Sequence, residues 1–138
     1  METTLILTIL ILILIAILFV VVYLNQKTIS KAKTKQILTK LNDLQMDIMS
    51  NESSVRRDAV IKLDNLLAKS LQYYYNNSLP CGDNLKKAKN IFKKKEYNDI
   101  WEAHKIRNNI VHNDYDIPQE EARKVYNTYK LSIIKIIK

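Results

Sequence analysis

The 138-residue chain contains one glycine, two prolines, one cysteine and two histidines. With so little glycine and proline, and with no sustained alternation of apolar and polar residues between turn signals, the sequence favours helices over a β-sheet. A single cysteine excludes a disulfide framework and a cysteine-based metal site. His104 and His112 lie eight positions apart with no acid at ligand spacing, so we expect neither a metal site nor a cofactor.

Charge is almost absent from the start of the chain. Glu2 is the only charged residue among the first 24, and from 5 to 24 only Thr8 and Tyr23 interrupt an aliphatic run. As a helix, residues 5–24 would be about 30 Å long, which is the thickness of the hydrocarbon core of a bilayer. A cleaved signal peptide fits less well, because a basic leading region and a small-residue cleavage site are missing. The sequence predicts a transmembrane helix in residues 1–25.

Basic residues flank this run on one side only. No lysine or arginine precedes it, and five lysines follow within 16 residues: Lys27, Lys31, Lys33, Lys35 and Lys40. Because basic loops stay on the cytoplasmic side, we expect a single-pass membrane protein with its N-terminus outside and its C-terminal domain in the cytoplasm.

The region after the apolar run is basic. It holds all 22 lysines and arginines and 13 of the 14 acids, all but Glu2, which gives a net charge of +9. Such a surface suits a polyanionic partner, either nucleic acid or anionic lipid headgroups. A lysine-rich surface without any such partner accounts for the composition equally well.

Residues 26–52 predict a juxtamembrane helical linker with a short apolar stripe. Ile37, Leu41, Leu44 and Ile48 follow one another at spacings of four, three and four. The stripe can pack against the following domain, or it can form a short coiled coil between two chains. Fewer than two heptads are present, which favours packing against the domain.

Residues 53–138 predict four helices. Ser50, Ser53 or Ser54 is expected to cap the first helix, which ends near the loop that contains Pro80 and Gly82. Its apolar positions keep helical spacing: Ala59, Val60, Leu63, Leu66, Leu67, Ser70, Leu71 and Tyr74.

Asp83 or Asn84 is expected to cap a short second helix, whose inner face is Leu85, Ala88, Ile91 and Phe92. A third helix is predicted from about 96 to 112, and Pro118 suits the first turn of a fourth helix that runs to Ile137. The inward positions expected in the third are Tyr97, Ile100, Trp101, His104, Arg107 or Asn108, and Val111; those in the fourth are Ala122, Val125, Tyr126, Tyr129, Ile133, Ile136 and Ile137. The expected fold class is all-α, with an antiparallel four-helix bundle behind the membrane helix.

One short stretch contains residue types that are common in catalytic sites. In "RNNIVH", an arginine and a polar residue precede a histidine at the predicted end of the third helix. With its surroundings, "WEAHKIRNNIVHNDYDIPQEEA", it resembles the third and fourth helices of the HEPN family, whose motif is an arginine, four to six residues and a histidine. Arg107, Asn108 and His112 match that motif.

"RRDAVIKLDNLLAKSL" is similar to the first helix of bacterial HEPN members, with Ala59 and Asp64 in step and Leu63 in place of a second alanine. The resemblance covers residues 55–136 and implies a four-helix domain that usually dimerises with its motifs facing across the interface. Active members are metal-independent ribonucleases that leave a cyclic phosphate, whereas many others are non-catalytic nucleotide-binding or assembly modules. The sequence identifies neither an RNA target nor a regulatory protein partner.

The residue types suit RNA cleavage. Histidine transfers protons near neutral pH, and the planar donors of a guanidinium match phosphate oxygens. On an ideal helix, however, Arg107 and His112 are separated by about 140°, so one copy supplies an incomplete site and a homodimer would supply two histidines. We therefore assign catalytic roles to Arg107, Asn108 and His112, with Asp64 and His104 in support.

Each of these residues also has a structural interpretation. Arg107 and His112 can pair with Asp64 to hold the bundle together, and Asp64 can be a satisfied polar residue of the core or can orient Arg107. His104 is more typical of a partly buried interior histidine than of a catalyst. Trp101 is typical of a core residue, with base stacking as a second option. The basic run that includes Lys86, Lys87, Lys93 and Lys94 is either a solvated face or a contact for RNA or another anion.

Overall fold

The computed structural model describes residues 1–24 and 29–138, and in these residues it contains helices and no strand. The predicted all-α class is confirmed. The elements in order are α1 (Glu2–Leu24), α2 (Lys31–Ile48), α3 (Ser53–Tyr75), α4 (Cys81–Lys87), the 3₁₀ turn η1 (Ala88–Ile91), α5 (Lys94–Asn113) and α6 (Gln119–Ile137).

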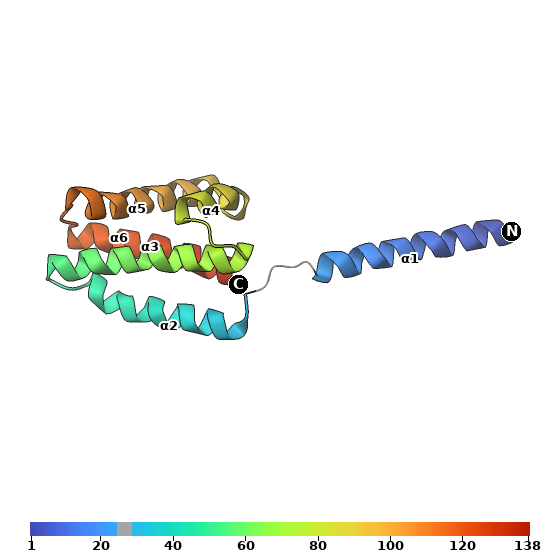
Figure 1. Ribbon diagram of the computed structural model, residues 1–138, viewed down its shortest axis with the longest axis horizontal. Helices are drawn as coiled ribbons and strands as arrows, with labels where there is room; N and C mark the ends of the chain where they lie inside the picture. The colour runs from blue at the N-terminus through green and yellow to red at the C-terminus, as the bar shows by residue number, and fades with distance from the viewer. Residues whose placement is uncertain (25–28) are drawn as a thin grey trace.

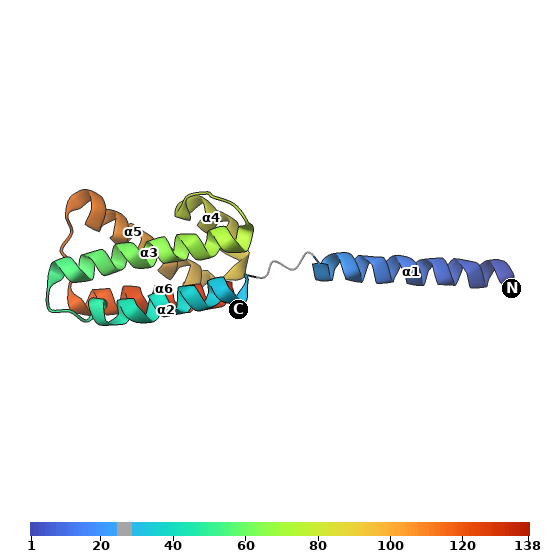
Figure 2. The same cartoon turned by 60° about the horizontal axis from the view of Figure 1, so that its bottom comes forward.

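The first helix stands apart from the rest of the molecule. Figures 1 and 2 show α1 projecting beyond one end of a helical bundle that contains all the other elements. None of its residues is buried, although nearly all of them are apolar. Among the described residues, it is the one helix whose length and composition would allow it to cross a membrane.

The apolar stripe of α2 packs against the bundle, as the sequence favoured. Ile37, Leu41, Leu44 and Ile48 are each at most 7% exposed and belong to the same buried cluster as the apolar residues of α3 and α6. The hydroxyl of Tyr126 on α6 donates a hydrogen bond to the backbone carbonyl of Leu41, at 3.2 Å. The segment predicted as a linker therefore contributes to the core of the domain that follows it.

The long helices α2, α3, α5 and α6 run side by side, and each is antiparallel to the long helix before it (Figure 1). The core lies around α3 and α6, and every inward position predicted for α6 is buried. The short α4 and η1 cover the C-terminal half of α3 and bring Leu85, Ala88 and Phe92 into the core. The bundle thus has four long helices because α2 is one of them.

Two predicted caps are wrong. Glu52, rather than one of the serines, is the N-cap of α3, and its backbone N–H donates to the hydroxyl of Ser50 at 3.1 Å. The short helix α4 begins at Cys81 after Pro80, earlier than a cap at Asp83 or Asn84 would allow. The reason lies in Asn84, which is buried and exchanges two hydrogen bonds of 2.8 and 2.9 Å with the side chain of Asn77. Its amide holds the loop closed instead of capping the helix.

The inner face of α5 is rotated slightly from the predicted one. Ile100, Ala103 and Ile110 are buried, whereas Val111, expected to face inward, is 46% exposed. The buried positions follow spacings of three, four and three through Arg107, which places Val111 at the border of the buried face. Helix α6 begins at Gln119, so that Pro118 is its N-cap rather than a residue of its first turn.

A buried arginine joins the two loops at one end of the bundle. Arg56 is 9% exposed, and its Nε donates a hydrogen bond to the carbonyl of Ile117 at 3.1 Å. Its Nη1 donates to the carbonyls of Ser50 and Asn51, both at 2.9 Å. One guanidinium therefore ties the α2–α3 loop to the α5–α6 loop and satisfies three backbone acceptors.

Candidate functional site

A buried carboxylate lies at the centre of the bundle. Asp64, in the middle of α3, is 2% exposed. Its Oδ1 accepts a hydrogen bond of 2.9 Å from the hydroxyl of Tyr129 on α6 and lies 2.7 Å from Nδ1 of His104 on α5. Because an ionised carboxylate can only accept, Nδ1 of His104 is the donor in that contact. Three helices thus meet at one side chain.

Arg107 lies on the other side of this carboxylate. Its Nε is 3.6 Å from Oδ2 of Asp64, which is an ion-pair distance but too long for a hydrogen bond, and this buried N–H has no hydrogen-bond partner. Its Nη1 donates to Oδ1 of Asn108 at 3.0 Å, and a quarter of the side chain remains exposed. The guanidinium therefore extends from the core towards solvent.

Helical spacing explains how α5 supplies two of these partners. His104 and Arg107 are three positions apart, so they lie on the same face of α5 and both reach Asp64. The ring of Trp101 packs edge-on against the imidazole of His104, with the ring centres 5.8 Å apart. His104 is thus a mostly buried histidine with a fixed orientation, in agreement with its structural interpretation.

Two groups beside Asp64 stay protonated. Burial, and then the Asp64 charge, raise the pKa of the Cys81 thiol well above its usual range. The same two causes raise the pKa of the Tyr129 hydroxyl. Cys81 is therefore a poor nucleophile, although it stands at the first position of α4.

Cys81, Asp64 and His104 form the one group of potential metal ligands found in the described residues, with their ligand atoms within 4.8 Å of one another. The expectation of no metal site rested on the single cysteine and on the spacing of the two histidines along the chain, and it did not foresee that the fold brings Cys81, Asp64 and His104 together. Its geometry is that of a hydrogen-bonded network, because a separation of 2.7 Å between Nδ1 and Oδ1 is shorter than the spacing of two ligands around a zinc ion. The charge of Arg107 beside Asp64 also disfavours a cation there.

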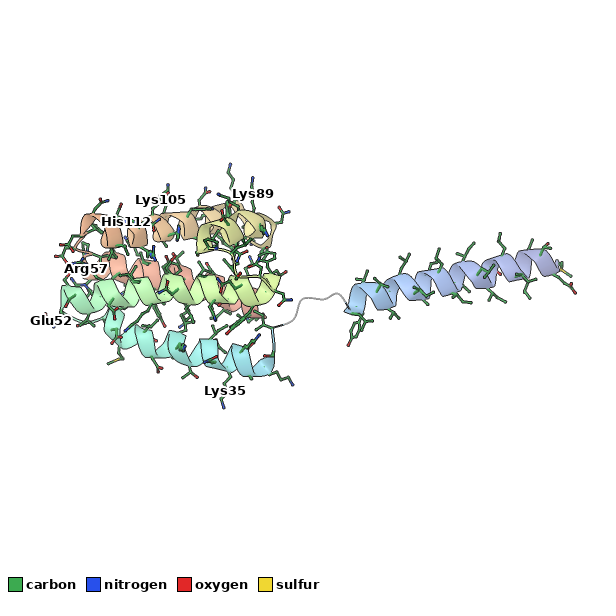
Figure 3. All side chains as sticks on the ribbon, in the orientation of Figure 1. Lys35, Glu52, Arg57, Lys89, Lys105 and His112 are labelled. Carbon is green, nitrogen blue, oxygen red and sulfur yellow. The ribbon has the colours of Figure 1, made fainter. Side chains whose placement is uncertain are left out.

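The other residues of the motif lie outside this network. His112 is exposed near the C-terminal end of α5, and Figure 3 shows it together with Lys105 on the outer side of that helix. Asn108 is half-buried and contacts Arg107. Within one chain, Arg107 points to the core and contacts Asn108, whereas His112 is exposed to solvent. Asn108 and His112 are four positions apart on α5 and therefore lie on the same face of the helix.

The predicted anion contacts lie at the other end of the domain. Lys86, Lys87, Lys93 and Lys94 are all exposed. Lys94 begins α5 and His112 nearly ends it, a separation of about 27 Å along the helix axis. These lysines therefore belong to a different surface from the motif.

Tyr129 and Cys81 were not singled out from the sequence as site residues. Tyr129 was predicted only as an inward position, and Cys81 only as a lone cysteine. They lie 65 and 17 positions from Asp64, and no local spacing indicates contacts of that kind. Their proximity to Asp64 depends on how the helices dock.

Comparisons of this chain with protein-family models, with curated proteins and with solved structures give no match.

Proposed function

We propose that this chain is a membrane-anchored protein of the HEPN type that cleaves RNA as a homodimer without a metal ion. Arg107 carries the proposal, because it is held on one side by the buried carboxylate of Asp64 and still exposes a quarter of its side chain. A guanidinium fixed in this way is ready to contact a phosphate, since little of its freedom remains to be lost on binding. In the proposed site, Asp64 orients Arg107, and His104 and Tyr129 fix Asp64.

The chemistry requires both copies of His112. One neutral imidazole removes the proton from a ribose 2′-hydroxyl, whose oxygen attacks the adjacent phosphorus. The bond from phosphorus to the 5′-oxygen then breaks, and the protonated imidazole of the partner's His112 donates a proton to that oxygen. The products are a 2′,3′-cyclic phosphate and a 5′-hydroxyl. Arg107 neutralises the charge that builds up on the phosphate oxygens, and Asn108 positions Arg107.

The outer side of α5 supports dimerisation through this helix. His112 is exposed, and the neighbouring aliphatic residue Val111 is 46% exposed. An interface along α5 would cover Val111 and bring the two copies of His112 together. The apolar α1 supports the anchor, because burial in lipid would remove its exposed aliphatic surface from water.

The test uses the full chain in detergent with mixed RNA and a chelator. We expect wild type to leave cyclic phosphate ends, and Arg107→Ala and His112→Ala each to lower the rate about 100- to 10,000-fold with helicity and dimer intact. Lys105→Ala is the matched control, because Lys105 is exposed on the same side of α5 but outside the motif. Intact RNA at every concentration where wild type is dimeric would refute cleavage.

A second candidate function is a membrane-tethered dimerisation module that binds a nucleotide or a partner protein without cleaving RNA. The ion pair between Arg107 and Asp64 favours it, because such a pair also serves to hold α3 to α5. In that case Arg107→Ala unfolds the domain, His112→Ala leaves it folded, and neither variant changes an RNA signal that was absent from the start.

A further inference from the structure

The net charge of the bundle lies entirely in the half that faces α1. Cutting each long helix at its middle gives a near half, residues 31–39, 64–103 and 129–138, and a far half, residues 40–63 and 104–128. The far half has eight basic and eight acidic residues, whereas the near half has thirteen lysines and five acids, one of which is the buried Asp64. In Figure 1 the near half is the end of the bundle from which α2 starts and at which α6 ends.

The acids of the near half are already paired. Three bind lysines of the same half: Asp83 with Lys86 at 3.3 Å, Asp99 with Lys95 at 2.7 Å, and Glu96 with Lys135 at 2.6 Å. Hydrogen bonds from Lys135 and from the backbone of Lys93 lower the pKa of the Glu96 carboxyl, which keeps that pair ionised. Glu102 pairs with Lys105. The near half therefore has no exposed, unpaired carboxylate that would repel an anion.

Many of the lysines have no such partner. Within residues 1–24 and 29–138, exposed near-half lysines without an ion pair to an acid are Lys31, Lys33, Lys35, Lys69, Lys87, Lys89, Lys93, Lys94 and Lys138. They come from five different segments of the fold, namely the start of α2, the end of α3, α4 with η1, the start of α5 and the end of α6, and they gather only because these segments share one end of the bundle. Figure 3 shows Lys35 and Lys89 on opposite sides of that end, so the lysines surround it rather than forming one stripe.

Aromatic side chains accompany the lysines. Tyr73, Tyr74 and Tyr75 form the last turn of α3 and are half-buried. The ammonium of Lys33 lies 4.2 Å from the centre of the Tyr73 ring. Half-exposed tyrosines among basic residues are typical of the headgroup region of a membrane, where an aromatic ring and its hydroxyl find both an apolar and a polar environment.

Covalent geometry limits how far this end can be from the anchor. Seven residue steps separate Leu24, the end of α1, from Lys31, the start of α2. Even a fully extended chain spans about 25 Å over that distance. The near half is thereby kept close to the bilayer surface, while electrostatic attraction to headgroups acts over about 8–10 Å at physiological salt.

We propose that the near half of the bundle docks on anionic lipid headgroups of the membrane in which α1 is anchored. The inference rests on the proposed membrane anchor and is independent of RNA cleavage. Docking leaves the far half, with His112, on the side away from the bilayer. RNA is the competing polyanion for the same lysines, but His112 lies in the far half of the bundle and these lysines lie in the near half.

The full chain is reconstituted into vesicles of phosphatidylcholine alone and of phosphatidylcholine with phosphatidylserine. Lysine labelling by an amine-reactive reagent is followed by mass spectrometry. On anionic vesicles only, we expect near-half lysines to be labelled more slowly, by about fivefold for each lysine that contacts the surface, and this protection to disappear in 1 M salt, where screening acts within about 3 Å. The far-half lysines Lys40 and Lys124 are internal controls, and their labelling stays the same.

Two variants with the same change in charge sharpen the test. Replacing Lys31, Lys35, Lys87 and Lys89 with glutamine should abolish the protection of the remaining near-half lysines. Replacing Lys40, Lys62, Lys105 and Lys124 with glutamine, all in the far half, should preserve it. An equal effect of the two variants would show that only net charge matters and would refute a docking surface.

The remaining outcomes also decide the proposal. If the near-half lysines are labelled equally on both vesicle types and the chain resists alkaline extraction from the vesicles, docking is refuted and the membrane anchor stands. A chain that alkaline extraction removes refutes the anchor and docking together. If the near-half variant loses RNA binding while lipid protection is unchanged, the surface belongs to RNA and docking is wrong.

Discussion

Replacing Asp64 tests whether its network holds the bundle together. Asp64→Ala removes the acceptor of Tyr129 and His104 and leaves the largely buried charge of Arg107 unpaired. Removing one partner of a buried ion pair costs about 3–5 kcal/mol, a large part of the roughly 5–15 kcal/mol that stabilises a typical domain. Asp64→Asn keeps one oxygen for Tyr129 and His104 but replaces the charged oxygen beside Arg107 with an amide NH2 group, so we expect a smaller loss of about 1–3 kcal/mol.

The assay is urea unfolding of the full chain in detergent, followed by circular dichroism and by the fluorescence of Trp101, whose ring contacts His104. Asp58→Ala is the matched control, because Asp58 lies on the same helix but is exposed and pairs only with Lys62. Such a surface pair contributes about 0.2–1 kcal/mol. If Asp64→Ala costs no more than Asp58→Ala, the buried network does not stabilise the fold and our reasoning about Asp64 fails.

Three further predictions concern stability. The thiol of Cys81 ionises near pH 9.0 in the unfolded chain and at higher pH in the folded one. The free energy of unfolding should therefore be constant with respect to this group below pH 9 and should fall above it by about 1.4 kcal/mol per pH unit. Cys81→Ala should flatten this slope between pH 9 and 10, before the hydroxyl of Tyr129 begins to contribute in the unfolded chain. Leu41→Ala should cost about 2–5 kcal/mol in urea unfolding because Leu41 is 1% exposed, and an equal loss in Leu38→Ala, which is 37% exposed, would contradict the burial of α2. Arg56→Lys should cost about 1–3 kcal/mol and raise amide exchange in both loops that Arg56 joins, since an ammonium lacks the planar fork that reaches three carbonyls.

Regular apolar spacing made much of the fold predictable. The stripes of α2 and α6 keep helical spacing over their whole length, and all their predicted positions are buried. Prediction was weaker where several residues could play one role, as at the start of α3, where three serines compete with Glu52. It was also weaker at the border of the buried face of α5, where Val111 and Ile110 are adjacent.

The candidate site was less predictable than the fold. The sequence indicated Arg107, Asn108 and His112 through the resemblance of "RNNIVH" to the HEPN motif, and Asp64 as a residue that could orient Arg107. It could not indicate that Tyr129 and Cys81 also contact Asp64, because these contacts join α3 to α6 and to α4. Contacts between helices depend on docking angles that no single segment of sequence determines.

The direction of α5 restricts the symmetry of any dimer. This helix runs from the end of the bundle near α1 towards the opposite end (Figure 1). If α1 anchors both copies of the proposed dimer in one bilayer, both chains enter it in the same sense, and a two-fold axis that relates them must lie along the membrane normal. If α5 also stands along that normal, the two α5 helices must run parallel, and each residue of the helix lies at the same height as its own copy. The two copies of His112 would then lie at the same height, whereas an antiparallel pairing of α5 in this orientation would require anchors in two separate membranes.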